Sequence, residues 1–143
     1  QAEEKKKPTT PYSAKFSGPF CIAVGLVDQA AGLEQFTQVK IDDPRIIDLA
    51  SKVSYHVDPA NEYPRNYSGH IRATMKDGTV HEVKQPHLRG GVREPLSRDE
   101  LVRKFEANLT FAGCSPDDMR TLRACCDNIF DAPNLHGLKV FRL

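Results

Sequence analysis

The stretch that most constrains the fold is Ala14–Asp28, a nearly uncharged run with Lys15 at its start. Its apolar residues recur at helical spacing and also occupy the opposite side, which predicts a helix buried on all sides. Ser17 is placed to cap this helix, and Pro19 suits its first turn. The run is too short and too interrupted to span a bilayer, which takes about 20 apolar residues.

Lys15 is the one cation beside the start of this predicted helix. Helix N-termini and ammonium groups both favour anions, so this place is a candidate anion contact. The simpler interpretation is that Lys15 extends its charge into water. The sequence leaves both interpretations open.

Length and composition limit the remaining options. At 143 residues the chain has the length of one domain, and its net charge of +1 does not suit a nucleic-acid binder. It shows neither a signal segment nor a membrane-spanning run, so we expect a cytoplasmic protein without membrane partners. None of the four cysteines has C-x-x-C spacing, which predicts reduced structural thiols and no zinc or iron–sulfur cluster.

Residues 1–13 are polar and interrupted by prolines, which predicts a linker or extended arm. A helix is expected from Asp43 or Pro44 to Val53, followed by a short strand over residues 53–57. Apolar and polar residues alternate over residues 71–76, and Asp77-Gly78, a pair favoured in tight turns, follows them, which predicts a β-hairpin. In its second strand, residues 79–84, Val80 and Val83 are three residues apart, so we expect a bulge there.

The loop of residues 85–95 contains Arg89 and Gly90, and a glycine among arginines lets backbone N–H groups approach an anion. An ordinary flexible connection is the alternative. Two capped helices are expected next, beginning at Ser97 and Ser115. The prediction is an α+β fold: residues 14–143 form a single domain whose small antiparallel sheet, with a central hairpin, is covered by helices from both ends of the chain.

The residues do not by themselves define a catalytic centre. The five histidines lack helical metal-ligand spacing, and no nucleophile elbow, phosphate-binding loop or dinucleotide motif is present. We therefore name no catalytic residue, no metal ligand and no cofactor. The two candidate anion-facing places are Lys15 and the loop around Arg89 and Gly90.

Several segments, in order along the chain, resemble the MmgE/PrpD family. The matching segments are Ala14-Lys15-Phe16-Ser17, Pro19-Phe20-Cys21, Leu26-Val27-Asp28, Leu33, Phe36, Asp43-Pro44, Leu49-Ala50, Lys76-Asp77-Gly78 and Pro95-Leu96-Ser97. The chain departs from the family at Asp28-Gln29, where Asp-Gly is common. Tyr67 lies near the place where cis-aconitate decarboxylases of the family carry a tyrosine, although Ser68 also fits that position.

The resemblance implies the smaller, C-terminal α+β domain of a lyase of the 2-methylcitrate dehydratase type, linked to propionate metabolism, or of a related decarboxylase or epimerase. Such a domain covers the cleft of a larger helical N-terminal domain, which carries most of the acid and base residues and acts on a small polycarboxylate without a cofactor. The candidate substrate contacts are then Lys15, Ser17, Arg89 and Gly90. The expected partners are that helical domain, the polycarboxylate and a second copy of the chain. Alone the chain is expected to be inactive, and a non-catalytic binding or regulatory module is the alternative.

Overall fold

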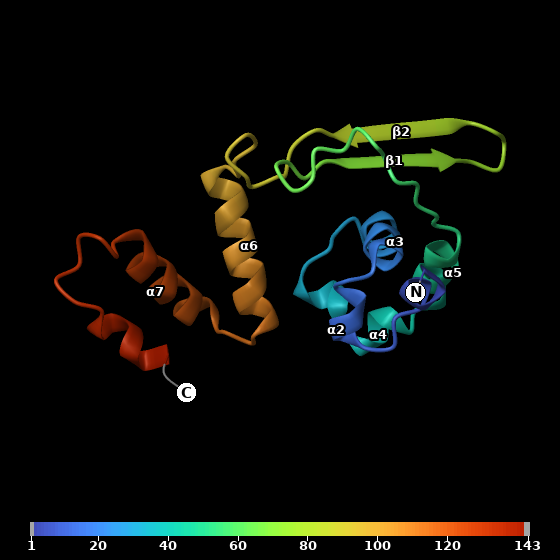
Figure 1. Cartoon of the computed structure of the whole chain (residues 1–143). Helices are drawn as coiled ribbons and strands as arrows, with labels where there is room; N and C mark the ends of the chain where they lie inside the picture. Colours follow the sequence, from blue (N-terminus) through green and yellow to red (C-terminus); the bar gives the residue numbers. More distant parts are fainter. Residues whose placement is uncertain (1, 142–143) are drawn as a thin grey trace. The chain divides into compact units, whose positions relative to one another are not determined.

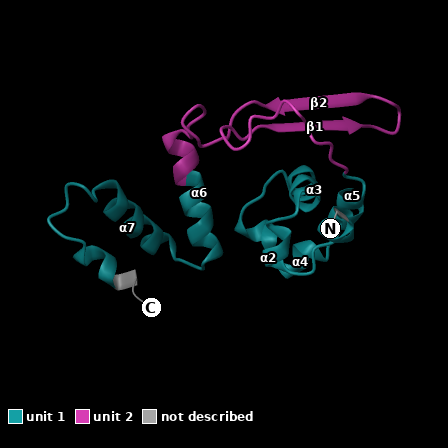
Figure 2. Ribbon diagram, viewed as in Figure 1, with its two compact units in different colours: residues 1–53, 103–143 teal, residues 54–102 magenta. Residues whose placement is uncertain are grey.

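The computed structural model describes residues 2–141 (Figure 1). Its elements are, in order, α1 Ala2–Lys6, α2 Pro11–Ala14, α3 Gly18–Asp28, η1 Leu33–Phe36, α4 Gln38–Ile41, α5 Pro44–Ser51, β1 Gly69–Thr74, β2 Val80–Gln85, α6 Arg98–Phe111, α7 Pro116–Asp127 and η2 His136–Phe141. The chain divides into two compact units, residues 1–53 with 103–143, and residues 54–102 (Figure 2). The α+β class with a small antiparallel sheet is confirmed.

The buried apolar core lies in the first third of the chain, where α3 packs against α5. Its members are Ala14, Phe20, Ala23, Val24, Ile41, Ile46 and Ala50. The caps of both helices follow the sequence: Ser17 accepts a hydrogen bond from the Phe20 N–H, and Asp43 accepts one from the Arg45 N–H. However, α3 is not surrounded as expected. Leu26 on its other side is 59% exposed, because the described elements that contact α3 cover only one face.

The N-terminal segment differs from the predicted extended arm. Residues 2–6 form α1, which contacts α3 and α5, and α2 begins at Pro11. The local reason for α2 is a capping box: the Thr10 hydroxyl accepts from the Ser13 N–H at 3.1 Å, and the Ser13 hydroxyl accepts from the Thr10 N–H at 3.1 Å. Pro11 therefore begins a helix instead of preventing one.

The predicted hairpin is confirmed. Strands β1 and β2 pair antiparallel from Gly69 opposite Gln85 to Thr74 opposite Val80. Gly78 turns the chain with a φ of 86°, and the Asp77 carboxylate accepts from the Thr79 N–H at 2.9 Å. The expected bulge is absent from this described ladder, which pairs residue for residue, so Val80 and Val83 lie on opposite faces.

The strands are mostly exposed on both faces. Of the twelve strand residues, ten are exposed and two are half-buried, so the cover of helices that we expected over the sheet is not reflected in the burial of its side chains. The segment before β1 was expected to contain a strand at residues 53–57. It is irregular, and Tyr55 and Val57 are exposed, because no strand of the described sheet pairs with it.

Helices α6 and α7 begin and end as their caps predict. Ser97 and Glu100 form the capping box of α6, Gly113 follows that helix with a φ of 78°, and Ser115 caps α7. Neither helix contains a fully buried residue. Over residues 2–141, none of the helices combines the length and the apolar character that crossing a membrane requires.

Candidate functional site

The first candidate place is the connection between α2 and α3. Lys15 ends α2 in a right-handed helical conformation and donates its backbone N–H to the Tyr12 carbonyl at 3.2 Å. Its side chain is exposed, and no carboxylate in residues 2–141 forms an ion pair with it. An ammonium group without a counter-charge, next to the beginning of a helix, remains able to bind an anion.

Ser17 is buried, unlike Lys15, although the two are only two residues apart. Ser17 is 1% exposed, and its hydroxyl accepts from the Phe20 N–H at 3.0 Å. The same hydroxyl donates to the carbonyl of Lys5 in α1. The hydroxyl therefore already donates and accepts a hydrogen bond inside the protein. This geometry favours a structural role for Ser17 in the connection over a contact with substrate.

A second hydrogen bond joins the same two segments in the opposite direction, because the Lys5 Nζ donates to the Phe16 carbonyl at 3.0 Å. We call this pair of bonds, Ser17 to Lys5 and Lys5 to Phe16, the α1 clamp. Sequence reasoning missed it because residues 1–13 look like a linker. The signal that could have revealed part of this order is the Thr10-x-x-Ser13 capping pattern with Pro11 between them.

Two exposed aromatic rings accompany Lys15. Tyr12 and Phe16 are 72% and 60% exposed, and their ring centroids lie 5.1 Å apart. The connection thus offers to its surroundings one cation and two aromatic rings. Such a surface suits contact with another molecule or another domain better than it suits bulk water.

The second candidate place is the loop around Arg89 and Gly90. The Arg89 guanidinium pairs with Glu94 at 3.5 Å and with Glu100. The pKa of Glu100 is lowered, first by the backbone N–H of Ser97 and further by Arg89. Two carboxylates therefore already compensate the charge of Arg89, whereas Lys15 has no such ion pair among the described residues.

Gly90 has a structural role in the same loop. Its φ is 88°, a left-handed conformation that favours glycine, and its N–H donates to the Glu94 carbonyl at 2.7 Å. The next N–H, of Gly91, donates to the Leu88 carbonyl at 2.9 Å. The amide groups expected to approach an anion are thus engaged within the loop. Lys15 and Ser17 belong to one unit and Arg89 and Gly90 to the other.

The histidines do not gather. His70 lies 2.5 Å from Glu82 across the hairpin and lowers the pKa of that carboxyl, while His87 is 3.5 Å from the Asn66 amide oxygen. Within residues 2–141, no group of three or more histidine, cysteine, aspartate or glutamate side chains has a metal-binding arrangement. The four cysteines are free thiols, and burial raises the pKa of Cys21.

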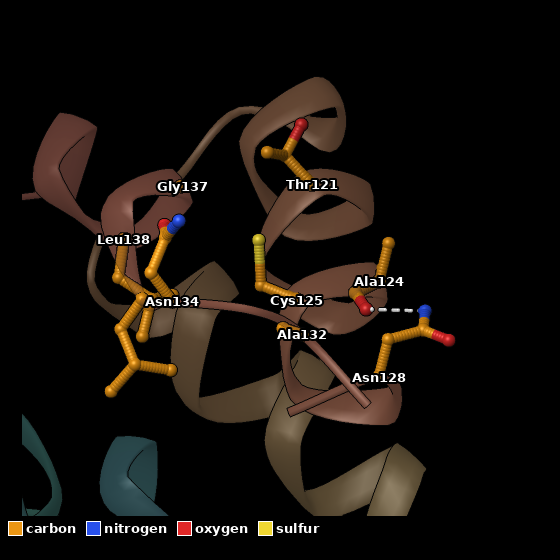
Figure 3. Close-up of a pocket in the computed structure, with 9 residues that line it drawn as sticks. Thr121, Ala124, Cys125, Asn128, Ala132, Asn134, Gly137 and Leu138 are labelled. Atoms are coloured by element: carbon orange, nitrogen blue, oxygen red, sulfur yellow. Dashed lines mark hydrogen bonds between the residues drawn. The ribbon is translucent and has the colours of Figure 1, made fainter. Parts of the chain in front are cut away.

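A pocket of about 480 Å³ lies between α7 and η2 (Figure 3). It is lined by Thr121, Ala124, Cys125, Asn128, Ala132, Asn134, Leu135, Gly137 and Leu138. The side-chain amide of Asn128 donates back to the Ala124 carbonyl at 2.9 Å. None of these lining residues is charged, so the pocket offers no cationic side chain to bind the carboxylates of a polycarboxylate.

Comparison with known proteins places these features in a family. Residues 2–127 match the MmgE/PrpD C-terminal domain. This match includes the segment that the sequence suggested was a linker, in agreement with the docking of α1 on α3.

Curated proteins that match the chain include cis-aconitate decarboxylases. The Homo sapiens protein is 29% identical over 102 residues, 71% of this chain and 21% of the relative. The Mus musculus protein is 27% identical over 110 residues, covering 75% and 22%, and the Aspergillus terreus protein is 28% identical over 122 residues, covering 81% and 24%. The chain thus spans less than a quarter of the length of these relatives. By its match over most of its length, the chain belongs to the MmgE/PrpD family, of which it contains the C-terminal domain.

Proposed function

We propose that this chain is the cleft-covering domain of an MmgE/PrpD-type lyase that acts on a small polycarboxylate of the cis-aconitate or 2-methylcitrate kind. The observation that carries the proposal is Lys15, an exposed ammonium group without a counter-charge in the described part of the chain, within a segment that matches the family. The names of the relatives support the substrate class, since cis-aconitate carries three carboxylates.

Lys15 is the substrate contact that the geometry favours among the four candidates. Ser17 and Gly90 use their polar groups inside the protein, and Arg89 is paired with Glu94 and Glu100. An ammonium group can hold one carboxylate of a substrate while the reaction takes place at a neighbouring carbon. The free cysteines favour a reducing, cytoplasmic setting for this activity.

The proton transfer is assigned to a partner, the helical N-terminal domain of the family, on the same chain or another. Loss of water or of carbon dioxide beside a carboxylate needs an acid or base of tuned pKa held against the substrate. In the described residues the buried polar side chains are Ser17 and Gln35, and neither is a base at neutral pH. The chain alone is therefore expected to lack turnover.

The test compares the chain alone with the chain joined to the helical domain of the Aspergillus terreus relative. Each protein is assayed for decarboxylation of cis-aconitate and dehydration of 2-methylcitrate. The joined protein should act on one of them, and Lys15→Ala should lower its kcat/KM roughly tenfold or more, as expected for loss of a charged contact. Lys139→Ala is the matched control, because Lys139 is exposed and lies outside the family match.

The pattern of kinetic change tells how Lys15 acts. If it holds a carboxylate equally in ground and transition states, KM rises while kcat is unchanged; if the contact strengthens as charge develops, kcat falls too. Turnover by the chain alone would contradict the assignment of proton transfer to the helical domain. A folded joined protein that binds either compound without turnover would favour the non-catalytic binding module instead.

A further inference from the structure

The backbone is anchored on both sides of the exposed Lys15 side chain. Ala14, directly before Lys15, is 0% exposed in the core, and Ser17, two residues after it, is 1% exposed. The Lys15 N–H donates to the Tyr12 carbonyl at 3.2 Å. The Ser17 N–H donates to the Ala14 carbonyl at 3.1 Å. Lys15 therefore extends from a short stretch whose two ends are held by the helical unit.

One distant residue, Lys5, holds the middle of this stretch. Its Nζ donates to the Phe16 carbonyl at 3.0 Å, although the two residues are eleven positions apart. The backbone carbonyl of Lys5 accepts from the Ser17 hydroxyl. Lys5 thus binds both of the residues that directly follow Lys15, one through its side chain and one through its backbone.

The neighbouring lysines do not form such a contact. Lys6 pairs with Glu3 inside α1 at 3.0 Å. Lys7 is exposed, and within residues 2–141 it forms neither an ion pair nor a hydrogen bond. Because α1 itself contacts α3 and α5, the bond from Lys5 joins the connection to an element that is already docked.

We propose that Lys5 is a positioning residue for Lys15. By holding the Phe16 carbonyl and the Ser17 hydroxyl, Lys5 fixes the backbone from which the Lys15 side chain extends, and so limits the directions in which the ammonium group points. A contact whose backbone is ordered before binding loses less conformational entropy when the substrate arrives. This inference rests on the proposed role of Lys15 as the contact for a substrate carboxylate.

The test is a double-mutant cycle in the joined protein, which carries the full 143-residue chain. Lys5→Met removes the donor to the Phe16 carbonyl and should lower kcat/KM roughly threefold to tenfold, as expected for loss of one hydrogen bond. In the Lys15→Ala background, Lys5→Met should change kcat/KM by less than about twofold, because no ammonium group is left to position. Lys5→Arg keeps the charge and the N–H donors, so it should recover most of the activity that Lys5→Met loses.

Lys7→Met is the matched control, because it removes a nearby lysine that makes no contact in the described chain. It should leave kcat/KM unchanged. In the 143-residue chain alone, Lys5→Met should speed trypsin cleavage after Lys15, since the stretch opens more often, whereas Lys7→Met should not. Circular dichroism should show the same helix content in both variants and in the unaltered chain.

Three results would overturn the proposal. Equal losses from Lys5→Met with and without Lys15 would mean that Lys5 acts independently, as a second contact to the substrate would. Lys5→Met that behaves like Lys7→Met would remove the positioning effect, and loss of helix signal in Lys5→Met would make the role of Lys5 purely structural. Failure of the proposed function looks different, because Lys15→Ala alone would then leave kcat/KM unchanged and this inference would fall with it.

Discussion

Replacing Ser17 with alanine tests whether the α1 clamp and the cap of α3 hold the helical unit together. The hydroxyl of Ser17 is 1% exposed, accepts from the Phe20 N–H and donates to the Lys5 carbonyl. Loss of an N-cap costs about 1 kcal/mol, and loss of a buried hydrogen bond costs a further amount of about 0.5–1.5 kcal/mol. We therefore expect Ser17→Ala to lower the free energy of unfolding by about 2 kcal/mol.

The assay is urea unfolding followed by helix signal in circular dichroism, with amide exchange at Val24 as a local readout in α3. Limited trypsin digestion provides a second readout. Ser17→Ala should speed cleavage after Lys5 and Lys6, because α1 loses one of the two bonds of its clamp.

Ser115→Ala is the matched control for Ser17→Ala. Ser115 also caps a helix that has a proline in its first turn, and its hydroxyl accepts from the Asp118 N–H at 3.1 Å, but Ser115 is exposed. Its loss should cost about 1 kcal/mol or less. If Ser17→Ala costs no more than Ser115→Ala, and trypsin cleavage is unchanged, the reasoning is refuted.

Two further predictions concern caps of the same unit. Gln29 ends α3 with a φ of 54°, so Gln29→Gly should raise the free energy of unfolding by about 0.5–1 kcal/mol; a lower urea midpoint would contradict this. The hydrogen bond from the Arg45 side chain lowers the pKa of Asp43 from its ordinary 3.8 to about 2. The ionised Asp43 carboxylate therefore stabilises the fold above pH 3.8, and this stabilisation is lost as the pH falls toward 2. Asp43→Asn keeps the cap but cannot ionise, so it should flatten that part of an acid titration followed by circular dichroism.

Local signals in the sequence predicted the elements whose ends depend on nearby residues. The caps at Ser17, Asp43, Ser97 and Ser115 are where the sequence places them. The hairpin turn at Asp77-Gly78 is also correct. Such signals succeed because a cap or a tight turn is decided by hydrogen bonds within three or four residues.

Longer-range order was harder to predict from the sequence. The α1 clamp joins Lys5 to Ser17 through a backbone carbonyl, and a carbonyl leaves no mark in the sequence. Similarly, nothing local shows that Arg89 meets Glu100 eleven residues later. Lys15, by contrast, is exposed and forms no ion pair within residues 2–141.

The sequence by itself determined the α+β class, the family, the positions of the capped helices and the register-setting turn, because each rests on local chemistry or on motifs in order. The tertiary structure alone decided what those elements do. It showed that residues 2–6 dock on α3, that α3 buries one face only, and that Ser17 and Arg89 use their polar groups within the protein. The physical reason is that burial and charge compensation depend on which distant segments meet, and alternation or spacing along a chain carries little information about that.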